Sequence, residues 1–221
     1  MVLAARFVPA LRFHFLTRFF DPLLRLALDE RGFKERLIQQ AALAPGHRLM
    51  DLGCGTGTLL VMIARQIPGV SLVGLDPDAA VLGIARRKLA AAGVAAGLVQ
   101  AFPWESPFPA ASFDRIVSSL VLHHLLPGDK ERTLAAAFEL LVPGGELHVL
   151  DLGKAHNLAM RLASLAPRLA DGLSATAQNV HGELPRLIAA AGFPGVREEH
   201  HAATVFGTVA WYRGVKPAAT R

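Results

Sequence analysis

The run Asp-Leu-Gly-Cys-Gly-Thr-Gly at residues 51–57 is the part of this sequence whose residue types and spacing most clearly suggest chemistry. Its glycines allow the backbone to approach a ligand closely, and the helical pattern that follows would present unpaired backbone N–H groups. Asp76 stands about twenty residues further on, at the end of the next β-rich run, where a carboxylate can accept hydrogen bonds from ribose hydroxyls. The turn and Asp76 together indicate a nucleotide-like ligand.

The residues around this turn narrow the choice of nucleotide. Thr58 stands where a dinucleotide fingerprint has its third glycine, and no lysine follows the glycines as a phosphate-binding P-loop requires. Asp51 would repel a pyrophosphate but suits a ligand that carries positive charge. The sulfonium and ammonium groups of S-adenosylmethionine carry such charge, so the sequence favours this cofactor over a dinucleotide.

Histidines supply the candidate acid–base groups. His123 and His124 directly follow the fourth β-rich run, and ligands gather at the carboxyl ends of strands in open α/β sheets. Histidine can take a proton from a phenol, a ring carbon or an amine near neutral pH. Capping the next helix, or lining the cofactor pocket, would explain the same two residues equally well. His156 and Asp151 hold the matching position after the fifth run, and His156 is a weaker catalytic candidate.

The remaining polar candidates favour structural roles. His200 and His201 are neighbours in a β-rich run of the tail, so they should point to opposite faces, and we expect a solvated surface role rather than metal binding. No set of His, Cys and carboxylate residues has the spacing of a structural metal site, so no metal is predicted. Cys54, the single cysteine, is expected to be a small packed residue rather than a reactive thiol.

Alternating β-rich runs and helical patterns must position these residues, and from Arg48 onward they predict βαβ units with a mostly parallel sheet. The predicted strands are 48–52, 71–75, about 96–101, 114–118 and 146–152, followed by a closely spaced pair at 196–202 and 204–213. The predicted helices are 58–66, a segment capped by Asp78 and ended by Gly93, 130–141, and 184–191 closed by Gly192. Pro143-Gly144-Gly145 predicts a turn before the fifth strand.

Two segments lie outside this alternation. Apolar residues recur every three or four positions over residues 13–40, which predicts an amphipathic helix broken near Asp21-Pro22. A second apolar stripe predicts a helix inserted after the fifth strand; it consists of Leu158, Leu162, Leu165 and Leu169.

The motifs, in their order, resemble those of a known family. They are the 51–57 turn with Asp76, the stretch from Ser106-Pro107-Phe108-Pro109 to Ser112-Phe113-Asp114, Leu122-His123-His124-Leu125, and Leu141-Val142-Pro143-Gly144-Gly145-Glu146. From about Gly46 to Gly153 the sequence resembles class I S-adenosylmethionine-dependent methyltransferases, most of all the small-molecule subgroup named for the ubiquinone/menaquinone C-methyltransferases. The resemblance implies an α/β fold with a Rossmann-like, doubly wound, seven-stranded sheet, mostly parallel with its last strand antiparallel, and an N-terminal helical cap.

The resemblance also implies roles for individual residues. The backbone of the glycine turn would lie against the methionine and ribose parts of S-adenosylmethionine, Asp76 would bind the ribose hydroxyls, and Leu75 and Pro77 would flank the adenine. Phe102 replaces the acidic residue with which relatives bind the adenine amino group, so ring packing would replace a hydrogen bond worth about 1 kcal/mol. The full expected cofactor set is Asp51, Gly53, Cys54, Gly55, Thr56, Gly57, Asp76, Pro77, Ala101, Phe102 and Ser118.

In the related enzymes the region before the first strand and the insertion after the fifth cover the cofactor and shape the acceptor pocket. Four phenylalanines of the first region suit a lid over an apolar substrate; they are Phe13, Phe15, Phe19 and Phe20. Contact with an anionic membrane is a second explanation of this arginine-and-phenylalanine pattern, and ordinary packing against the sheet is a third.

Composition predicts one folded domain over residues 1–221. With 52% hydrophobic and 19% charged residues the chain is too apolar for intrinsic disorder. We divide it into a helical cap (1–46), a cofactor-binding core (47–153), and a lid insertion with the C-terminal strand pair (154–221). The sequence contains no uninterrupted run of about 20 apolar residues, so we expect no membrane-spanning helix. Arginines break the apolar N-terminus too regularly for a secretory signal. One cysteine fits a cytoplasmic location.

The charge of the chain is unevenly distributed. The net charge is +5, yet residues 47–153 hold 8 Lys and Arg against 10 Asp and Glu, so the basic excess falls in the flanking segments. These segments form the predicted lid and acceptor side. The excess therefore favours an anionic acceptor or a peripheral membrane contact over nucleic acid, for which we find no dedicated motif.

The sequence as a whole predicts methyl transfer from S-adenosylmethionine to a small, apolar or aromatic acceptor of the quinone, phenol or lipid kind. One alternative is a non-catalytic S-adenosylmethionine-binding protein or a membrane-associated regulator, and Phe102 is the residue that favours it. A lesser alternative is an NAD(P)-dependent oxidoreductase, which Thr58 disfavours.

Overall fold

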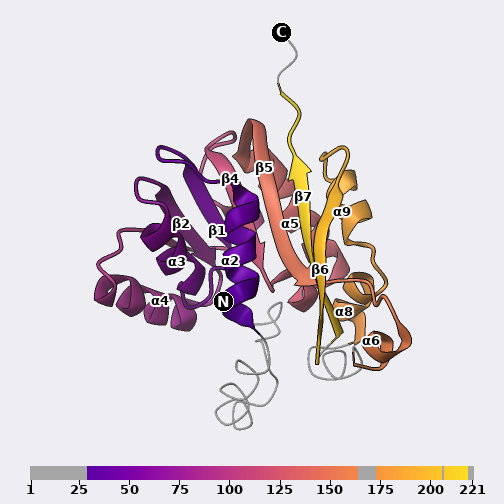
Figure 1. The fold of residues 1–221 in the computed structure, drawn as a ribbon. Helices are drawn as coiled ribbons and strands as arrows, with labels where there is room; N and C mark the ends of the chain where they lie inside the picture. The colour runs from indigo at the N-terminus through magenta and orange to yellow at the C-terminus, as the bar shows by residue number, and fades with distance from the viewer. Residues whose placement is uncertain (1–28, 164–172, 206, 219–221) are drawn as a thin grey trace, which may run out of the picture.

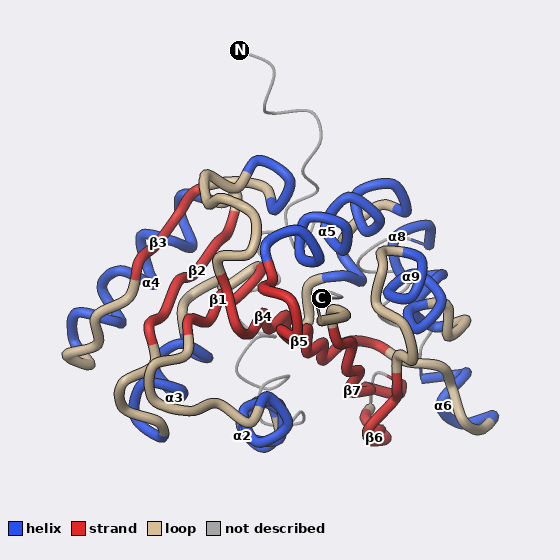
Figure 2. Tube along the Cα trace, turned by 90° about the horizontal axis from the view of Figure 1, so that it is seen from above, coloured by secondary structure: helices blue, strands red, loops and turns tan. Residues whose placement is uncertain are grey.

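A seven-stranded sheet forms the centre of the molecule in the computed structural model, which describes residues 29–163, 173–205 and 207–218. The strand order is β3-β2-β1-β4-β5-β7-β6 (Figure 1; β3 is labelled in Figure 2). Neighbouring strands from β3 to β5 run parallel, whereas β7 pairs antiparallel with both β5 and β6. The predicted sheet, mostly parallel with an antiparallel last strand, is therefore confirmed.

The elements follow the predicted alternation of strands and helices. The strands are β1 (Arg48–Leu52), β2 (Ser71–Asp76), β3 (Gly97–Gln100), β4 (Phe113–Ser119), β5 (Leu141–Leu152), β6 (Arg197–Thr204) and β7 (Gly207–Val215). The helices are α2 (Glu30–Ala41), α3 (Thr58–Gln66), α4 (Ala79–Ala91), α5 (Pro127–Leu140), α6 (Leu158–Ala163), α8 (Leu173–Val180) and α9 (Leu184–Ala190), with short 3-10 helices η2 (Pro103–Glu105) and η3 (Leu122–His124). Helix α8 has no counterpart among the predicted helices.

Helices cover both faces of the sheet. Viewed from above, α2 and α3 lie on one face, and α5, α8 and α9 lie on the other (Figure 2). One buried cluster includes Leu37 of α2, Leu60 of α3 and Leu82 of α4, and a second includes Leu134 of α5 and Leu187 of α9. Strand β1 is buried after its first residue, as expected for a parallel strand covered on both sides. The doubly wound arrangement is thus confirmed.

Local sequence signals set both ends of α4. The carboxylate of Asp78 accepts a hydrogen bond from the backbone N–H of Ala80 at 2.7 Å, and Gly93, just beyond the helix, has a φ of 64°. An Asp cap and a left-handed glycine are the expected start and stop of a helix, and both were predicted here. The cap matters for the site because α4 carries a lysine to the glycine turn.

The segment Pro143-Gly144-Gly145 differs from the prediction. It forms no separate turn, because β5 already begins at Leu141 and the segment is an irregular stretch within that strand, where the register with β4 shifts. Gly144 adopts a φ of 80°, and its N–H donates to the carbonyl oxygen of Lys216, while the N–H of Lys216 donates to the carbonyl oxygen of Gly145. The chain after β7 therefore satisfies the backbone groups of this bulge and keeps the strand continuous.

Part of the predicted cap and lid lies outside the described residues. This part includes residues 1–28, with the four-phenylalanine lid, and residues 164–172, with Leu165 and Leu169. The described end of the cap is α2, whose N-cap Asp29 accepts a hydrogen bond from the N–H of Gly32. None of the helices in the described ranges is long and apolar enough to cross a membrane.

Candidate active site

The turn at residues 51–57 joins β1 to α3 at the carboxyl edge of the sheet. Gly53, Gly55 and Gly57 have positive φ angles of 71°, 51° and 74°, which favour glycine. At Gly53 there is also no room for a side chain, since a Cβ atom would lie 2.5 Å from Cγ2 of Val121, which follows β4. A Cβ atom at Gly55 would meet nothing within 4 Å. The turn is therefore closed against the chain at Gly53 and open to a ligand at Gly55.

Asp76, at the end of β2, binds this turn directly. Its Oδ2 accepts the N–H of Gly55 at 3.0 Å and its Oδ1 accepts the N–H of Asp78 at 2.9 Å. Burial raises the pKa of the Asp76 carboxyl, and the two backbone N–H groups counteract this rise. Each carboxylate oxygen keeps a further lone pair, so Asp76 can accept hydrogen bonds from ribose hydroxyls while it holds the turn.

Asp51, in β1, is a buried carboxylate beside the turn. It is 2% exposed, and within the described part of the chain no residue donates a hydrogen bond to its carboxylate. Burial raises the pKa of Asp51 to about 7, an effect that Lys34 of α2 opposes and Asp76 reinforces. A buried charge without a partner is costly, and a cationic group beside it would relieve that cost. The open glycine backbone and the two carboxylates therefore fit S-adenosylmethionine and do not fit a pyrophosphate.

Lys88 of α4 reaches the same turn, a contact that the sequence did not indicate. Its Nζ donates to the hydroxyl of Thr56 at 2.9 Å and to the hydroxyl of Thr58 at 2.7 Å. These residues are about thirty positions apart, so no local spacing relates them. A cavity of about 570 Å³ begins here and continues between side chains of α2 and α3.

The loops after β2 and β3 form the expected adenine side. The side-chain amide of Gln100 donates to the carbonyl oxygen of Pro77 at 3.3 Å, which joins the two loops. Phe102 stacks on Trp104, with ring centroids 4.9 Å apart and planes 7° from parallel. The guanidinium of Arg132 lies 4.0 Å from the centroid of the Trp104 ring. An aromatic stack thus stands where the sequence resemblance led us to expect an acidic residue, and sequence reasoning had found only its Phe102 member.

Four other residues expected near the cofactor are packed into the protein. Leu75 is fully buried in the core, so its side chain offers no surface to an adenine ring. Cys54 is 7% exposed, which confirms that it is a packed residue, and burial raises the pKa of its thiol. Ser118 is 2% exposed, and its hydroxyl has no hydrogen-bond partner among the described residues. Ala101 packs against the core on the α5 side.

His123, in η3 after β4, pairs with Asp151 near the end of the neighbouring strand β5. Its Nδ1 lies 2.8 Å from Oδ1 of Asp151, and the two residues are 7% and 0% exposed. The other carboxylate oxygen of Asp151 accepts the N–H groups of Val121 and Leu122 at 3.1 and 2.7 Å. One buried carboxylate therefore fixes both the imidazole ring and the backbone that carries it.

The charges at this pair favour a base. Burial by itself would raise the pKa of Asp151, but His123 and the backbone N–H groups of Leu152 and Leu122 outweigh burial and hold this pKa below its usual value. An ionised Asp151 accepts a hydrogen bond from the protonated Nδ1 of His123, which leaves Nε2 as the proton-accepting nitrogen. The arrangement is that of a general base oriented by a carboxylate.

Asn179 of α8 and Lys130 of α5 extend the pair into a buried chain of hydrogen bonds. The amide Nδ2 of Asn179 donates to Oδ1 of Asp151 at 2.9 Å, and Nζ of Lys130 donates to Oδ1 of Asn179 at 2.6 Å. Asn179 and Lys130 are both fully buried, and burial lowers the pKa of Lys130 to about 8. Sequence reasoning missed both residues, because α8 was not predicted and these positions are 49 apart.

The other two catalytic candidates lie differently. The ring of His124 is 3.9 Å from that of His123, and burial, with His123 beside it, lowers the pKa of His124 to about 3, so His124 is neutral. His156 is exposed and stacks on His201, with ring centroids 3.7 Å apart. The structure thus separates His156 from Asp151, although the sequence placed the two together after the fifth strand.

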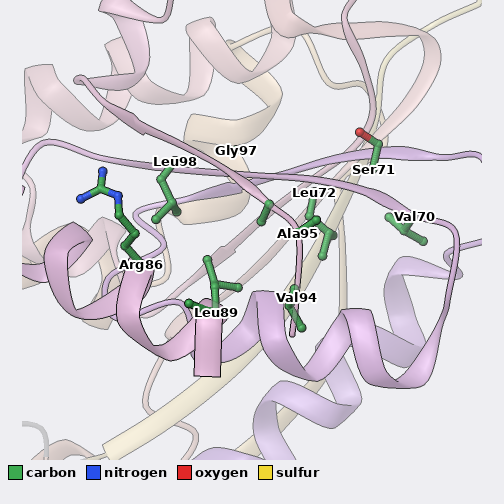
Figure 3. Close-up of a pocket in the computed structure, with 11 residues that line it drawn as sticks. Val70, Ser71, Leu72, Arg86, Leu89, Val94, Ala95, Gly97 and Leu98 are labelled. Atoms are coloured by element: carbon green, nitrogen blue, oxygen red, sulfur yellow. The ribbon is translucent and has the colours of Figure 1, made fainter. Parts of the chain in front are cut away.

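A second cavity, of about 740 Å³, lies between α4 and the strands β2 and β3 (Figure 3). It is bounded by the starts of β2 and β3, at Ser71 and Gly97, and by Leu89 in the second half of α4. Arg86 is the one charged side chain among its lining residues. Since the glycine turn, Asp76 and His123 occupy the carboxyl ends of the strands, this cavity is at the opposite edge of the sheet.

Known proteins share both the motifs and the fold. A family profile described as a methyltransferase domain matches residues 49–145. The chain is 31% identical over 208 residues to the ubiquinone/menaquinone biosynthesis C-methyltransferase UbiE of Cellvibrio japonicus, an alignment that spans 85% of this chain and 82% of that protein. The chain belongs to the class I S-adenosylmethionine-dependent methyltransferases. It is of the ubiquinone/menaquinone C-methyltransferase type, and S-adenosylmethionine is the cofactor of this family.

The chain also resembles two further proteins. It is 33% identical over 129 residues to a demethylmenaquinone methyltransferase of Thermus thermophilus, covering 58% of this chain and 57% of that protein. The chain spans 48–62% of the length of the first curated relatives it matches. The solved structure of YcgJ from Bacillus subtilis superposes with a TM-score of 0.69 at 15% identity, covering 86% of this chain and 100% of that one. That likeness concerns the fold, and it confirms the Rossmann-like prediction.

The matched family region does not contain the whole candidate site of the methyltransferase. Residues 49–145 include the glycine turn, Asp76 and His123, but they end within the bulge of β5. Asp151 and Asn179, which position the ring of His123, lie beyond it. The part of the site expected to act on the acceptor is therefore built largely from the second half of the chain.

Proposed function

We propose that this methyltransferase transfers the methyl group of S-adenosylmethionine to a small apolar or aromatic acceptor, with a quinone-, phenol- or lipid-like structure. The observation that carries the proposal is the buried His123–Asp151 pair beside the glycine turn. Val121, two residues before His123, is the residue against which Gly53 packs. A base so close to the cofactor turn serves an acceptor that must lose a proton. The demethylmenaquinone and ubiquinone/menaquinone enzymes among the relatives support a quinone-like ring.

The residues of the chain divide the work between binding and proton transfer. When bound, S-adenosylmethionine would supply a methyl group activated by its sulfonium: an aligned nucleophilic atom of the acceptor bonds to the methyl carbon as the carbon–sulfur bond breaks and S-adenosylhomocysteine leaves. No nucleophile on the enzyme is needed. Asp76 would hold the ribose, and Asp51 would offset the cofactor's positive charge. Nε2 of His123 takes the acceptor's proton, and Asp151 stabilises the imidazolium that results. A hydroquinone suits this base, because loss of its hydroxyl proton makes the adjacent ring carbon nucleophilic.

A second candidate is a non-catalytic S-adenosylmethionine-binding protein or a membrane-associated regulator. The Phe102–Trp104 stack favours it, because the adenine side then offers ring packing where relatives offer a carboxylate. Such packing lacks a hydrogen bond to the adenine amino group, so cofactor binding would be weaker. In this candidate the basic cap, residues 1–46, contacts an anionic membrane surface, and the contact weakens as salt is added.

Two measurements test the proposal. Calorimetry measures binding of S-adenosylmethionine and S-adenosylhomocysteine, and a radiolabelled methyl-transfer assay uses reduced demethylmenaquinone, a simple phenol and phosphoethanolamine as acceptors. We expect transfer to the aromatic acceptors and little to phosphoethanolamine. His123→Asn should lower turnover about a hundredfold and leave cofactor affinity unchanged. Absence of cofactor binding by folded protein contradicts the proposal, and binding without transfer to any of the three acceptors favours the second candidate.

A further inference from the structure

Three side chains with metal-binding atoms meet on the surface, away from the candidate active site. His156 comes from the segment after β5, and Glu198 and His201 come from β6. Nε2 of His156 lies 3.6 Å and Nδ1 of His201 lies 3.0 Å from Oε1 of Glu198. These three atoms all lie within 4.8 Å of one another, and within the described ranges this is the one such group of His, Cys, Asp or Glu. The two imidazole rings stack with centroids 3.7 Å apart.

A bulge in β6 brings this group together. Residues 198 and 201 are three apart, so in a regular strand their side chains would point to opposite faces of the sheet. The register shifts between Glu198 and His200, so that Glu198 pairs with Tyr212 and His200 pairs with the next residue, Trp211. The extra residue restores Glu198 and His201 to one face. Bulges commonly re-aim side chains near functional sites, and here the shift gathers two ligands on one side.

His200 provides the contrast within the same strand. Its ring lies 5.2 Å from that of Trp211, on the face covered by α2, as Trp211 also packs against Phe33 of that helix. The prediction that His200 and His201 face opposite sides is thus consistent with their partners. The side chain of His201 is 50% exposed, as a surface role predicts, but its meeting with His156 and Glu198 departs from the expectation that no metal-binding set is present. What the sequence did not indicate is the meeting of His201 with His156, 45 positions earlier in the chain.

The distances suit one transition-metal ion. A zinc ion binds imidazole nitrogen and carboxylate oxygen at about 2.0–2.2 Å in tetrahedral geometry, so its ligand atoms are about 3.3 Å apart. The two separations from Glu198, 3.0 and 3.6 Å, lie on either side of that value. A hydrogen bond does not account for the second separation, because 3.6 Å is too long for one. Imidazole ligands select zinc, copper or nickel over magnesium or calcium.

We propose that His156, Glu198 and His201 form a surface site for one Zn²⁺ ion, with water as the fourth ligand. The ion would join the segment that follows β5 to the edge strand β6. In the sheet this link lies two strands from Asp151, since Asp151 pairs with Ala210 of β7, and Ala210 pairs with His201. The proposal does not depend on the identity of the methyl acceptor or on catalysis.

Zinc binding by untagged, full-length protein tests the site. Protein stripped with a chelator is titrated with Zn²⁺ in competition with a chromogenic indicator, and Mg²⁺ serves as the control cation. We expect one Zn²⁺ per chain, no competition by Mg²⁺, and an increase in Tm when Zn²⁺ is added. His156→Ala, His201→Ala and Glu198→Gln should each weaken Zn²⁺ binding at least about tenfold and abolish the increase in Tm.

His200→Ala is the matched control, because it removes a neighbouring imidazole from the opposite face. It should bind Zn²⁺ as the unaltered protein does. The proposal is overturned if the unaltered protein binds no Zn²⁺, if the His156→Ala variant binds it with full affinity, or if His200→Ala weakens binding as much as His201→Ala. Thermal unfolding of each metal-free variant shows whether it is folded, and X-ray absorption of the zinc-loaded protein should show two imidazole ligands.

Discussion

His123 faces Asp151 across the carboxyl ends of two adjacent parallel strands, with Nδ1 of the ring 2.8 Å from Oδ1 of the carboxylate. The same carboxylate receives the N–H groups of Val121 and Leu122, and the side chain of Val121 closes the space beside Gly53. Asp151 therefore positions the candidate base and also the segment against which the glycine turn packs. A change at Asp151 should affect proton transfer first, and cofactor binding only through that packing.

Replacing Asp151 with Asn should lower kcat about a hundredfold or more, because an amide does not stabilise the imidazolium of His123. It should also lower the free energy of unfolding by about 1–3 kcal/mol, since the backbone N–H groups of Val121, Leu122 and Leu152 lose a charged acceptor. Turnover, the Kd of S-adenosylmethionine and urea unfolding measure the three effects. His124→Asn is the matched control, and we expect a change of only a few-fold. A loss in His124→Asn as large as in His123→Asn would contradict the assignment of the base.

Replacing Asp76 with Ala should weaken S-adenosylmethionine binding about tenfold or more, because it removes the ribose acceptor and frees the N–H of Gly55. Calorimetry measures the affinity. Asp78→Ala is the matched control, because it removes the cap of α4 two residues away. That variant should lose about 1 kcal/mol of stability and keep its cofactor affinity. Equal loss of affinity in both variants would show that Asp76 acts through the loop rather than on the ribose.

Local patterns were enough to predict the cofactor half of the site. Helix 58–66 and strand 48–52 have the predicted bounds. The spacing of apolar residues and the glycines that end each element are signals that extend over only a few residues, so they can be identified in a single sequence. The glycine turn and Asp76 likewise come together because parallel strands end at one edge of the sheet. This part of the fold follows from short-range signals and from the rules for joining βαβ units.

The other half depends on contacts between distant segments, for which one sequence carries no local signal. Asp151 binds His123 and Asn179, each of which is 28 positions away in the sequence. Lys88, in α4, binds Thr58 at the start of α3. Pairing with β7 determines the bulge in β6 that brings Glu198 and His201 to one face. Hydrogen bonds from the chain after β7 determine the bulge in β5. In each case the partner strand or helix, rather than the residue's own pattern, decides where the side chain lies.

Gly53 and Gly55 should respond differently to alanine. Both have positive φ, so each substitution costs about 1–2 kcal/mol in backbone strain. At Gly53 the new Cβ also meets Val121 at 2.5 Å, which adds about 1–3 kcal/mol, whereas at Gly55 it meets open space. Urea unfolding should therefore rank Gly53→Ala as the less stable variant. Adding Val121→Ala should recover part of the Gly53→Ala loss, and no recovery would show that the clash is not its cause.

The raised pKa of Asp51 should make stability depend on pH. Its folded-state pKa is about 7, against an ordinary value of 3.8. Between these values the folded protein keeps a proton that the unfolded chain has released, so stability present below pH 4 is lost as pH rises through 7. Asp51→Asn stays neutral and should escape this loss. Relative to the unaltered protein, its free energy of unfolding should gain about 2–3 kcal/mol between pH 5 and pH 8. The prediction is wrong if urea unfolding shows the same change in the free energy of unfolding with pH for Asp51→Asn as for the unaltered protein.

The same carboxyl should link cofactor affinity to pH. The positive sulfonium favours an ionised Asp51, so below pH 7 binding requires loss of a proton and the Kd of S-adenosylmethionine should rise as pH falls from 8 to 5. S-adenosylhomocysteine carries the same amino group without the sulfonium charge and should show a smaller rise. Asp51→Asn should remove the difference between the two ligands. Lys34→Met removes the charge that lowers the pKa of Asp51, so it should move the midpoint to higher pH. A midpoint unchanged in Lys34→Met would assign the titration to another group.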